Sequence, residues 1–172
     1  MLFRSWLNYG EKTLDGTNIN YEVFEHTDAY GRKYYTYKII NFSLNPDTAQ
    51  NIIIPRTMKV WYKLEQKDAI LEEIGSEVFL NSYLNSVKIT GYKKNTSVYV
   101  PVKIGKEAFA GNFVMMRFDV KASEMDAKVS EIGESVFEGN YLLSKMNIEG
   151  TTDYGIIGKK TFLFFCHICI IT

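Results

Sequence analysis

A six-residue pattern that begins with Ile-Gly and ends with Phe occurs four times between residues 74 and 162 of this 172-residue chain. The copies are IGSEVF at 74–79, IGKEAF at 104–109, IGESVF at 132–137 and IGKKTF at 157–162. Apolar residues follow each copy, with a spacing of three and then two positions in the first three: Leu84, Val87 and Ile89; Met115, Phe118 and Val120; Leu143, Met146 and Ile148; and finally Ile168 and Ile171. One such unit cannot bury its apolar face alone, so the pattern predicts a stack of similar coils.

The repeated glycines and phenylalanines set the size of each coil. The glycines occupy positions 75, 105, 133 and 158, so the intervals are 30, 28 and 25 residues. Glycine is expected where the backbone turns with positive φ or lies too close to its neighbour for a Cβ atom. The phenylalanines carry the largest apolar surface and should stack in one interior column. The predicted structural residues are Gly75, Phe79, Gly105, Phe109, Gly133, Phe137, Gly158 and Phe162.

The apolar spacing of three and then two predicts a short strand, entered from a bend, in each coil. Parallel pairing of these strands would line up their outward residues in columns. If Val87, Phe118 and Met146 point inward, one outward column is Ser86, Arg117 and Lys145, and the next is Lys88, Asp119 and Asn147. We take these six residues as a candidate ligand-facing surface, although a solvated sheet face of mixed charge explains them as well. Neighbouring Arg117 and Lys145 would repel unless an anion or a partner carboxylate lies close.

Two asparagines stand at matching positions in the bends. Asn112 and Asn140 each follow the repeated phenylalanine by three residues, where a side-chain amide could satisfy backbone groups from coil to coil. Exposed polar loop residues are the equally acceptable alternative. The polar segments 92–99 and 121–128 are typical of loops or short hairpins inserted in the returns between coils.

These residues resemble the coils of BspA-like leucine-rich repeat proteins, which follow the form IG-x-x-A-F-x-G-C/N-x-x-L-x-x-V-x-I-P. The resemblance covers residues 74–172; Ile, Gly and Phe hold in all four copies and Gly-Asn in two, whereas FLNSYL at 79–84 lacks the Gly-Asn pair and is one residue short. It implies a repeat or solenoid fold that is mainly β, with short helical or irregular returns and a parallel sheet on one face. Residues 73–172 would form four leucine-rich repeat coils.

The first part of the chain resembles the β-rich opening segment that commonly precedes such coils. INYEV at 19–23 alternates apolar and polar residues, a turn-like segment follows, and 33–44 has the character of a return strand. NIIIP at 51–55 and VWYKL at 60–64 are expected to be further strands. Residues 1–72 are therefore expected to form a β-rich amino-terminal cap of hairpins that covers the first coil. At the other end, FLFFCHICIIT at 162–172 lacks a polar outer face, so the last coil is expected to be truncated or uncapped. A homodimer through this end is one expectation, because unpaired strand edges can pair with another chain.

Composition argues against several classes of partner. Twenty basic and twenty acidic residues cancel, which gives no electrostatic footprint for nucleic acid or an anionic membrane. The longest apolar stretch, 161–171, is about half of the roughly twenty residues that a membrane-spanning helix needs. Residues 1–16 contain no apolar run of the length that a signal peptide requires.

Catalytic and metal-binding patterns are weak in this sequence. Cys166 and His167 are neighbours on an expected strand and would point to opposite faces, which prevents a nucleophile–base pair. CHIC at 166–169 lacks a second ligand pair, and EHTD at 25–28 fits an exposed turn better than a metal site. Phosphate-binding loops, serine elbows and metal-binding helix motifs are missing from the sequence. We therefore predict no enzyme, no cofactor and no metal site.

The family resemblance implies a non-catalytic recognition or adhesion module. Such a module would be extracellular or on the surface of a bacterial or similar microbial cell, and would bind a protein or another surface macromolecule through its sheet face. Two alternatives remain open: a structural spacer in a longer repeat array, and an unrecognised hydrolase whose site lies in the amino-terminal β segment.

Overall fold

A computed structural model describes residues 11–43, 49–91, 98–120, 129–148, 156–161 and 170–171. These ranges contain strands, turns and bends but no helix, and hence no helix that could cross a membrane. The strands are β1 (Glu11–Thr13), β2 (Ile19–Thr27), β3 (Lys33–Phe42), β4 (Gln50–Ile54), β5 (Thr57–Tyr62), β6 (Glu65–Ile74), β7 (Leu84–Ile89), β8 (Val102–Ile104), β9 (Arg117–Val120), β10 (Val129–Ile132), β11 (Lys145–Ile148), β12 (Ile156–Ile157) and β13 (Ile170–Ile171).

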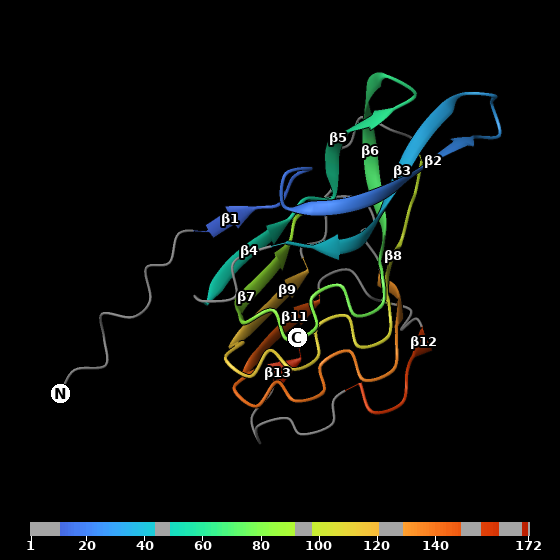
Figure 1. The fold of residues 1–172 in the computed structure, drawn as a ribbon. Helices are drawn as coiled ribbons and strands as arrows, with labels where there is room; N and C mark the ends of the chain where they lie inside the picture. The colour runs from blue at the N-terminus through green and yellow to red at the C-terminus, as the bar shows by residue number, and fades with distance from the viewer. Residues whose placement is uncertain are drawn as a thin grey trace.

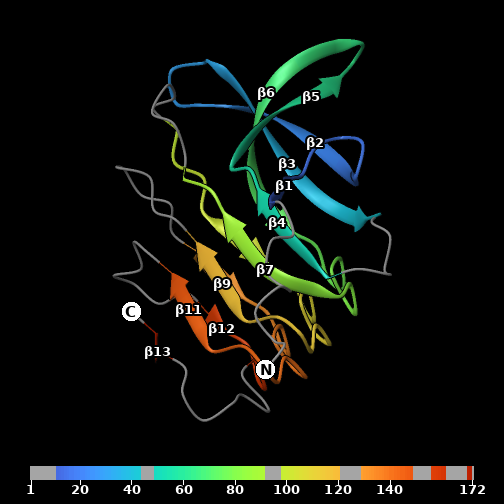
Figure 2. The same cartoon turned by 90° about the vertical axis from the view of Figure 1, so that its left-hand side faces the viewer.

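The strands form two sheets. The first sheet has the order β1-β4-β7-β9-β11-β13, and all of its neighbours are parallel. The second sheet has the order β12-β10-β8-β6-β3-β2, with β5 also paired to β6. From β6 onward the chain alternates between the two sheets, so that each repeat adds one strand to each (Figure 1). Figure 2 shows β4, β7, β9 and β11 of the first sheet side by side.

The second sheet occupies returns that were expected to be helical or irregular. Its parallel strands end at the isoleucine that precedes each repeat glycine, and Ile104 lies in register with both Ile74 and Ile132. The first and last residues of β8 and of β10 are buried, whereas Lys103, the central residue of β8, is exposed. Of the two expected forms, the helical return is wrong for the described residues, whereas segments such as 75–83 are irregular turns. The remaining parts of the returns are strands, because β-branched residues at both ends of β8 and β10 complete a second parallel sheet.

The core between the two sheets contains the predicted phenylalanine column. The rings of Phe79 and Phe109 stack with centroids 5.0 Å apart, and those of Phe109 and Phe137 stack at 6.0 Å. Phe118 packs edge-on against both Phe109 and Phe137, at 5.1 Å and 4.8 Å. All four rings have no exposed surface, which confirms the interior column for these coils. Phe162 lies outside the described residues.

Close approach of successive coils explains the repeated glycines. A Cβ atom on Gly105 would lie 2.6 Å from the backbone nitrogen of Ser76, and one on Gly133 would lie 2.7 Å from that of Lys106. None of the four repeat glycines has a positive φ. Of the two expected reasons for glycine, close approach of a neighbouring backbone is therefore the one that applies. At Gly158 the neighbour is Glu134 of the preceding repeat, and at Gly75 it is the carbonyl oxygen of Ile39 on β3.

The amino-terminal part contributes strands to both sheets. The expected hairpins are present as the antiparallel pairs β2–β3 and β5–β6, which extend away from the repeat strands (Figure 1). Beyond these hairpins, β3 pairs in parallel with β6, and β4 with β7, where Ile52 lies opposite Val87. The expected boundary after residue 72 falls within β6. The division into a cap and four coils stays a prediction. Residues 162–169, in the coil that was expected to be truncated or uncapped, lie outside the described residues.

Candidate functional site: the outer face of the first sheet

The register of the first sheet aligns the residues of the two predicted columns, although Asp119, which was expected to face outward, is only 6% exposed. Arg117 lies between Ser86 and Lys145, and Asp119 lies between Lys88 and Asn147. The residues that alternate with them, Val87, Phe118 and Met146, are buried in the core. We call the following six the sheet-face residues: Ser86, Lys88, Arg117, Asp119, Lys145 and Asn147.

The first column continues onto strands that were assigned to the cap. Asn51 on β4 lies opposite Ser86, and Glu11 on β1 lies opposite Asn51. The Oδ1 atom of Asn51 accepts hydrogen bonds from Ser86 Oγ and Asn85 Nδ2, both at 2.7 Å. The sequence predicted the strand that carries Asn51 but not that this strand pairs with β7. The apolar pattern of NIIIP indicates this pairing, since Ile52 and Ile54 match Val87 and Ile89 of β7.

An ion pair within β9 orients the only arginine of the sheet-face residues. Nε of Arg117 donates to the carboxylate of Asp119, which is largely buried, whereas the Arg117 side chain is 52% exposed. This hydrogen bond and the negative charge of Asp119 raise the pKa of Arg117. A carboxylate was expected to offset the repulsion between the neighbouring cations Arg117 and Lys145. For Arg117, this carboxylate is Asp119 on the same strand.

The part of the outer face that β7, β9 and β11 form carries an excess of positive charge, whereas β1 adds the carboxylate of Glu11 to the first column. Strands β7, β9 and β11 contain three cationic residues, Lys88, Arg117 and Lys145, against one anionic residue, Asp119. The chain as a whole has a formal net charge of zero. A local excess of positive charge of this kind favours attraction of an anionic partner.

The two asparagines of the bends form a buried ladder and take no part in this surface. Nδ2 of Asn112 donates to the carbonyls of Phe79 and Phe109, both at 2.8 Å. Its Oδ1 accepts from the backbone nitrogen of Leu84 at 3.0 Å. Asn140 in turn accepts from the backbone nitrogen of Asn112 at 2.8 Å. The ladder interpretation is confirmed, and the alternative of exposed loop residues is wrong.

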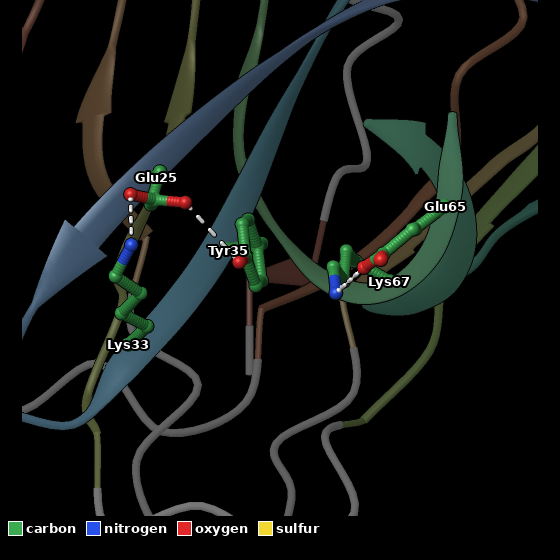
Figure 3. A network of polar contacts seen from close by, with 5 residues as sticks. All are labelled: Glu25, Lys33, Tyr35, Glu65 and Lys67. Carbon is green, nitrogen blue, oxygen red and sulfur yellow. Dashed lines mark hydrogen bonds and ion pairs between the residues drawn. The ribbon is translucent and has the colours of Figure 1, made fainter. Parts of the chain in front are cut away.

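A second polar cluster joins the hairpins (Figure 3). Lys33 Nζ lies 2.8 Å from Glu25 Oε1, and the Tyr35 hydroxyl donates to Glu25 Oε2 at 3.2 Å. Lys67 pairs with Glu65 and its ammonium lies 5.8 Å from the centre of the Tyr35 ring. The Lys33 ammonium lowers the pKa of Glu25, and Glu25 raises the pKa of Lys33. These exposed pairs align the hairpin strands but form no enclosed site.

The residues of EHTD separate into different contacts. Glu25 pairs with Lys33, Asp28 pairs with Arg32 at 2.8 Å, and His26 Nε2 lies 2.8 Å from Thr36 Oγ1. Among the residues that the structure describes, no group of three or more His, Cys, Asp or Glu side chains is arranged to hold a metal ion. Cys166, His167 and Cys169 lie outside the described residues.

The fold is similar to that of a leucine-rich repeat protein. A crystal structure of a leucine-rich repeat protein from Bacteroides capillosus matches with a TM-score of 0.51 over 86% of this chain and 92% of that chain, at 16% sequence identity. No family model matches the sequence, and no curated protein matches it. At this level of identity the likeness shows a leucine-rich-repeat-like fold.

Proposed function

We propose that this protein is a non-catalytic recognition or adhesion module that binds a protein or another surface macromolecule through the sheet-face residues. The proposal includes a location on the surface of a microbial cell or in its surroundings, as the BspA-like repeat pattern implies. The observation that carries it is the pair of aligned outward columns, with their excess of two positive charges (three cations against one anion) on a sheet of parallel strands.

The geometry of this face suits binding to an extended partner. Its side chains project from hydrogen-bonded strands whose intervening residues are packed in the core, so little conformational freedom of the backbone is lost on binding. Stacked coils place equivalent side chains at regular intervals, which produces a long continuous surface. The ion pair of Arg117 with Asp119 further restricts the arginine before any partner arrives.

We further propose that residues 73–172 are coils of a BspA-like solenoid and that residues 1–72 form their amino-terminal cap. Strand alternation between the two sheets supports the coils, and the hairpins β2–β3 and β5–β6 support the cap. A homodimer through the carboxyl end remains part of the proposal. Light scattering that shows a monomer over a wide concentration range would count against such a dimer.

Binding of the purified chain to arrays of extracellular-matrix proteins, host-cell proteins and glycans tests the recognition function. For each protein or glycan bound, the double substitution Arg117→Ser with Lys145→Ser should weaken affinity by about tenfold or more, because two cations are removed from one column. The matched control is Lys59→Ser with Lys103→Ser, which removes two cations from the second sheet. Equal affinities of the wild type and the Arg117/Lys145 variant would exclude the sheet face, and a chain that binds nothing would favour a structural spacer.

A further inference from the structure

Two turns at the corner of the stack contain apolar residues, of which Phe113, Tyr141 and Leu142 are exposed and Val114 is half-buried. The backbone nitrogen of Met115 bonds to the carbonyl of Asn112 at 2.8 Å, and that of Leu143 bonds to Asn140 at 3.2 Å, so each segment closes a four-residue turn. The central residues are Phe113–Val114 in one turn and Tyr141–Leu142 in the other. Central turn positions are usually polar, Gly or Pro. None of these four residues has a positive φ, so their backbone conformation selects no special residue type.

Together with the half-buried Tyr83, these residues form a strip across three repeats. Tyr83, Phe113 and Tyr141 each follow the repeated phenylalanine by four positions. Phe113 is 51% exposed and Tyr141 57%, and the rings of Tyr83 and Phe113 lie 5.3 Å apart. We call Tyr83, Phe113, Val114, Tyr141 and Leu142 the corner strip. Because the core is already filled by the stacked phenylalanines, an aligned apolar strip on the outside indicates a contact surface.

Cations of the sheet face border the corner strip. Arg117 and Lys145 are the first residues of β9 and β11, and each lies two positions after the end of a corner turn. The ion pair with Asp119 involves Nε of Arg117, whereas a guanidinium group carries five N–H donors. Aromatic residues next to arginine are the combination enriched at the centre of protein interfaces.

We propose that the corner strip, together with Arg117 and Lys145, docks an acidic protein segment that carries apolar side chains beside its carboxylates. This inference rests on the proposed recognition function, shares two of its residues and names the class of partner. The exposed aromatic and aliphatic side chains would receive the apolar groups, and the two cations would pair with the carboxylates.

The shape of the strip favours a protein over an anionic polysaccharide. The rings of Tyr83 and Phe113 are tilted by 58° to each other, so they do not make the continuous flat platform on which a row of sugar rings would stack. Val114 and Leu142, which follow Phe113 and Tyr141 in the sequence, add branched aliphatic groups to the strip. Such an uneven apolar surface is complementary to the side chains of a peptide.

Selection of random linear peptides displayed on phage, with the immobilised full chain as bait, tests the inference. We expect the enriched sequences to combine Asp or Glu with Leu, Phe or Trp. A synthetic peptide of the consensus sequence should bind less tightly as the salt concentration rises. Fluorescence anisotropy should show about tenfold weaker binding after Phe113→Ser with Tyr141→Ser, and after Arg117→Ser with Lys145→Ser. The matched control, Phe24→Ser with Tyr30→Ser, removes two exposed aromatic residues from the β2–β3 hairpin and should leave affinity unchanged.

The variants separate this inference from the function on which it rests. If only the Arg117/Lys145 variant weakens binding, the sheet face stands and the corner strip is overturned. If neither variant weakens binding, both are overturned. If no peptide is enriched, or if the enriched peptides lack acidic residues, the proposal of an acidic protein partner is overturned.

Two further measurements test other occupants of the strip. Displacement of the peptide by polygalacturonate, lost in the Phe113/Tyr141 variant, would assign the strip to a polysaccharide and overturn the inference. A dimer of the wild type that the same variant abolishes in light scattering would assign it to a second copy and overturn it as well. Circular dichroism and thermal melting of each variant establish that the fold is retained.

Discussion

At the scale of single residues, a few buried polar side chains fix the alignment of neighbouring repeats. Asn112 contacts the preceding repeat through Phe79 and Leu84, its own repeat through Phe109, and the following repeat through Asn140. Its side chain is completely buried, so each of these bonds satisfies a group that water cannot reach. The sequence indicated the position of this residue, but its three sets of partners follow only from the stacking.

Asn112→Ala should lower the free energy of unfolding by about 3 kcal/mol, because it leaves a backbone N–H and two carbonyls in the core with fewer partners. Chemical denaturation monitored by circular dichroism measures the change. The matched control is Asn20→Ala on the edge strand β2, where the side chain is exposed and the change should stay within about 0.5 kcal/mol. Equal effects of the two substitutions would contradict a stabilising role for the ladder.

Tyr37 is a buried group that links stability to alkaline pH. Its hydroxyl donates to the carbonyl of Pro55, and its ring has no exposed surface. Burial raises the pKa of Tyr37 well above its usual value, and the positive charge of Arg56 opposes this only in part. The folded state thus holds the phenolic proton more tightly than the unfolded chain, in which the pKa is about 10.

The contribution of Tyr37 to stability should be complete below about pH 10 and should decline as the pH rises further, by up to about 1.4 kcal/mol per pH unit. In Tyr37→Phe this titration is absent, although the lost hydrogen bond lowers stability by about 1 kcal/mol at neutral pH. The difference in free energy of unfolding between the two proteins should therefore shrink between about pH 9 and 11. Parallel pH profiles from urea denaturation would refute this assignment.

At the scale of elements, the β5–β6 hairpin has an unfavourable turn. Lys63 and Leu64 connect the strands with φ values of 46° and 67°, in the left-handed region that Asn and Gly adopt more readily. Leu64 is 95% exposed and has little packing to lose. The expected strand VWYKL at 60–64 includes both turn residues, whereas β5 ends at Tyr62, so the expectation is wrong for Lys63 and Leu64. The sequence indicated no turn there, because neither residue is a usual turn former.

Lys63→Asn with Leu64→Gly should raise the free energy of unfolding by roughly 1 kcal/mol, since two left-handed residues each cost about 1–2 kcal/mol and the contact of Lys63 with the Tyr62 ring is lost. Thermal and urea denaturation measure the gain. As a control, Gln66→Gly in the adjacent strand β6 should have the opposite sign, at about 1 kcal/mol. A loss of stability in the turn variant would show that this conformation is not strained.

At the scale of the whole molecule, the stacked phenylalanines connect the repeats into one core. Phe109 contacts Phe79 on one side and Phe137 on the other, and Phe42 extends the column with its ring 4.6 Å from that of Phe79. Phe42 belongs to the segment assigned to the cap, so the core is continuous across the expected boundary. The coils predicted from the repeat and the strands that precede them share one interior.

Phe109→Ala should destabilise the protein by about 3–5 kcal/mol, because the cavity removes contacts with both neighbouring repeats. Phe113→Ala in the same repeat removes the same side chain from the surface and should cost less than about 1 kcal/mol. Guanidinium chloride denaturation of both variants provides the comparison. Similar losses for the two substitutions would show that the interior column does not dominate stability.

The sequence by itself determined the phase of the repeats: which residues face inward, and hence that Ser86, Arg117 and Lys145 share one outward column. This was possible because the alternation of side chains along a strand is a local property. Only the tertiary structure decided which segments became neighbours. It placed β4 beside β7 and formed a second sheet from segments as short as Val102–Ile104, which are too brief to show any periodicity. Pairing depends on contacts between residues distant in sequence, and a local pattern does not contain them.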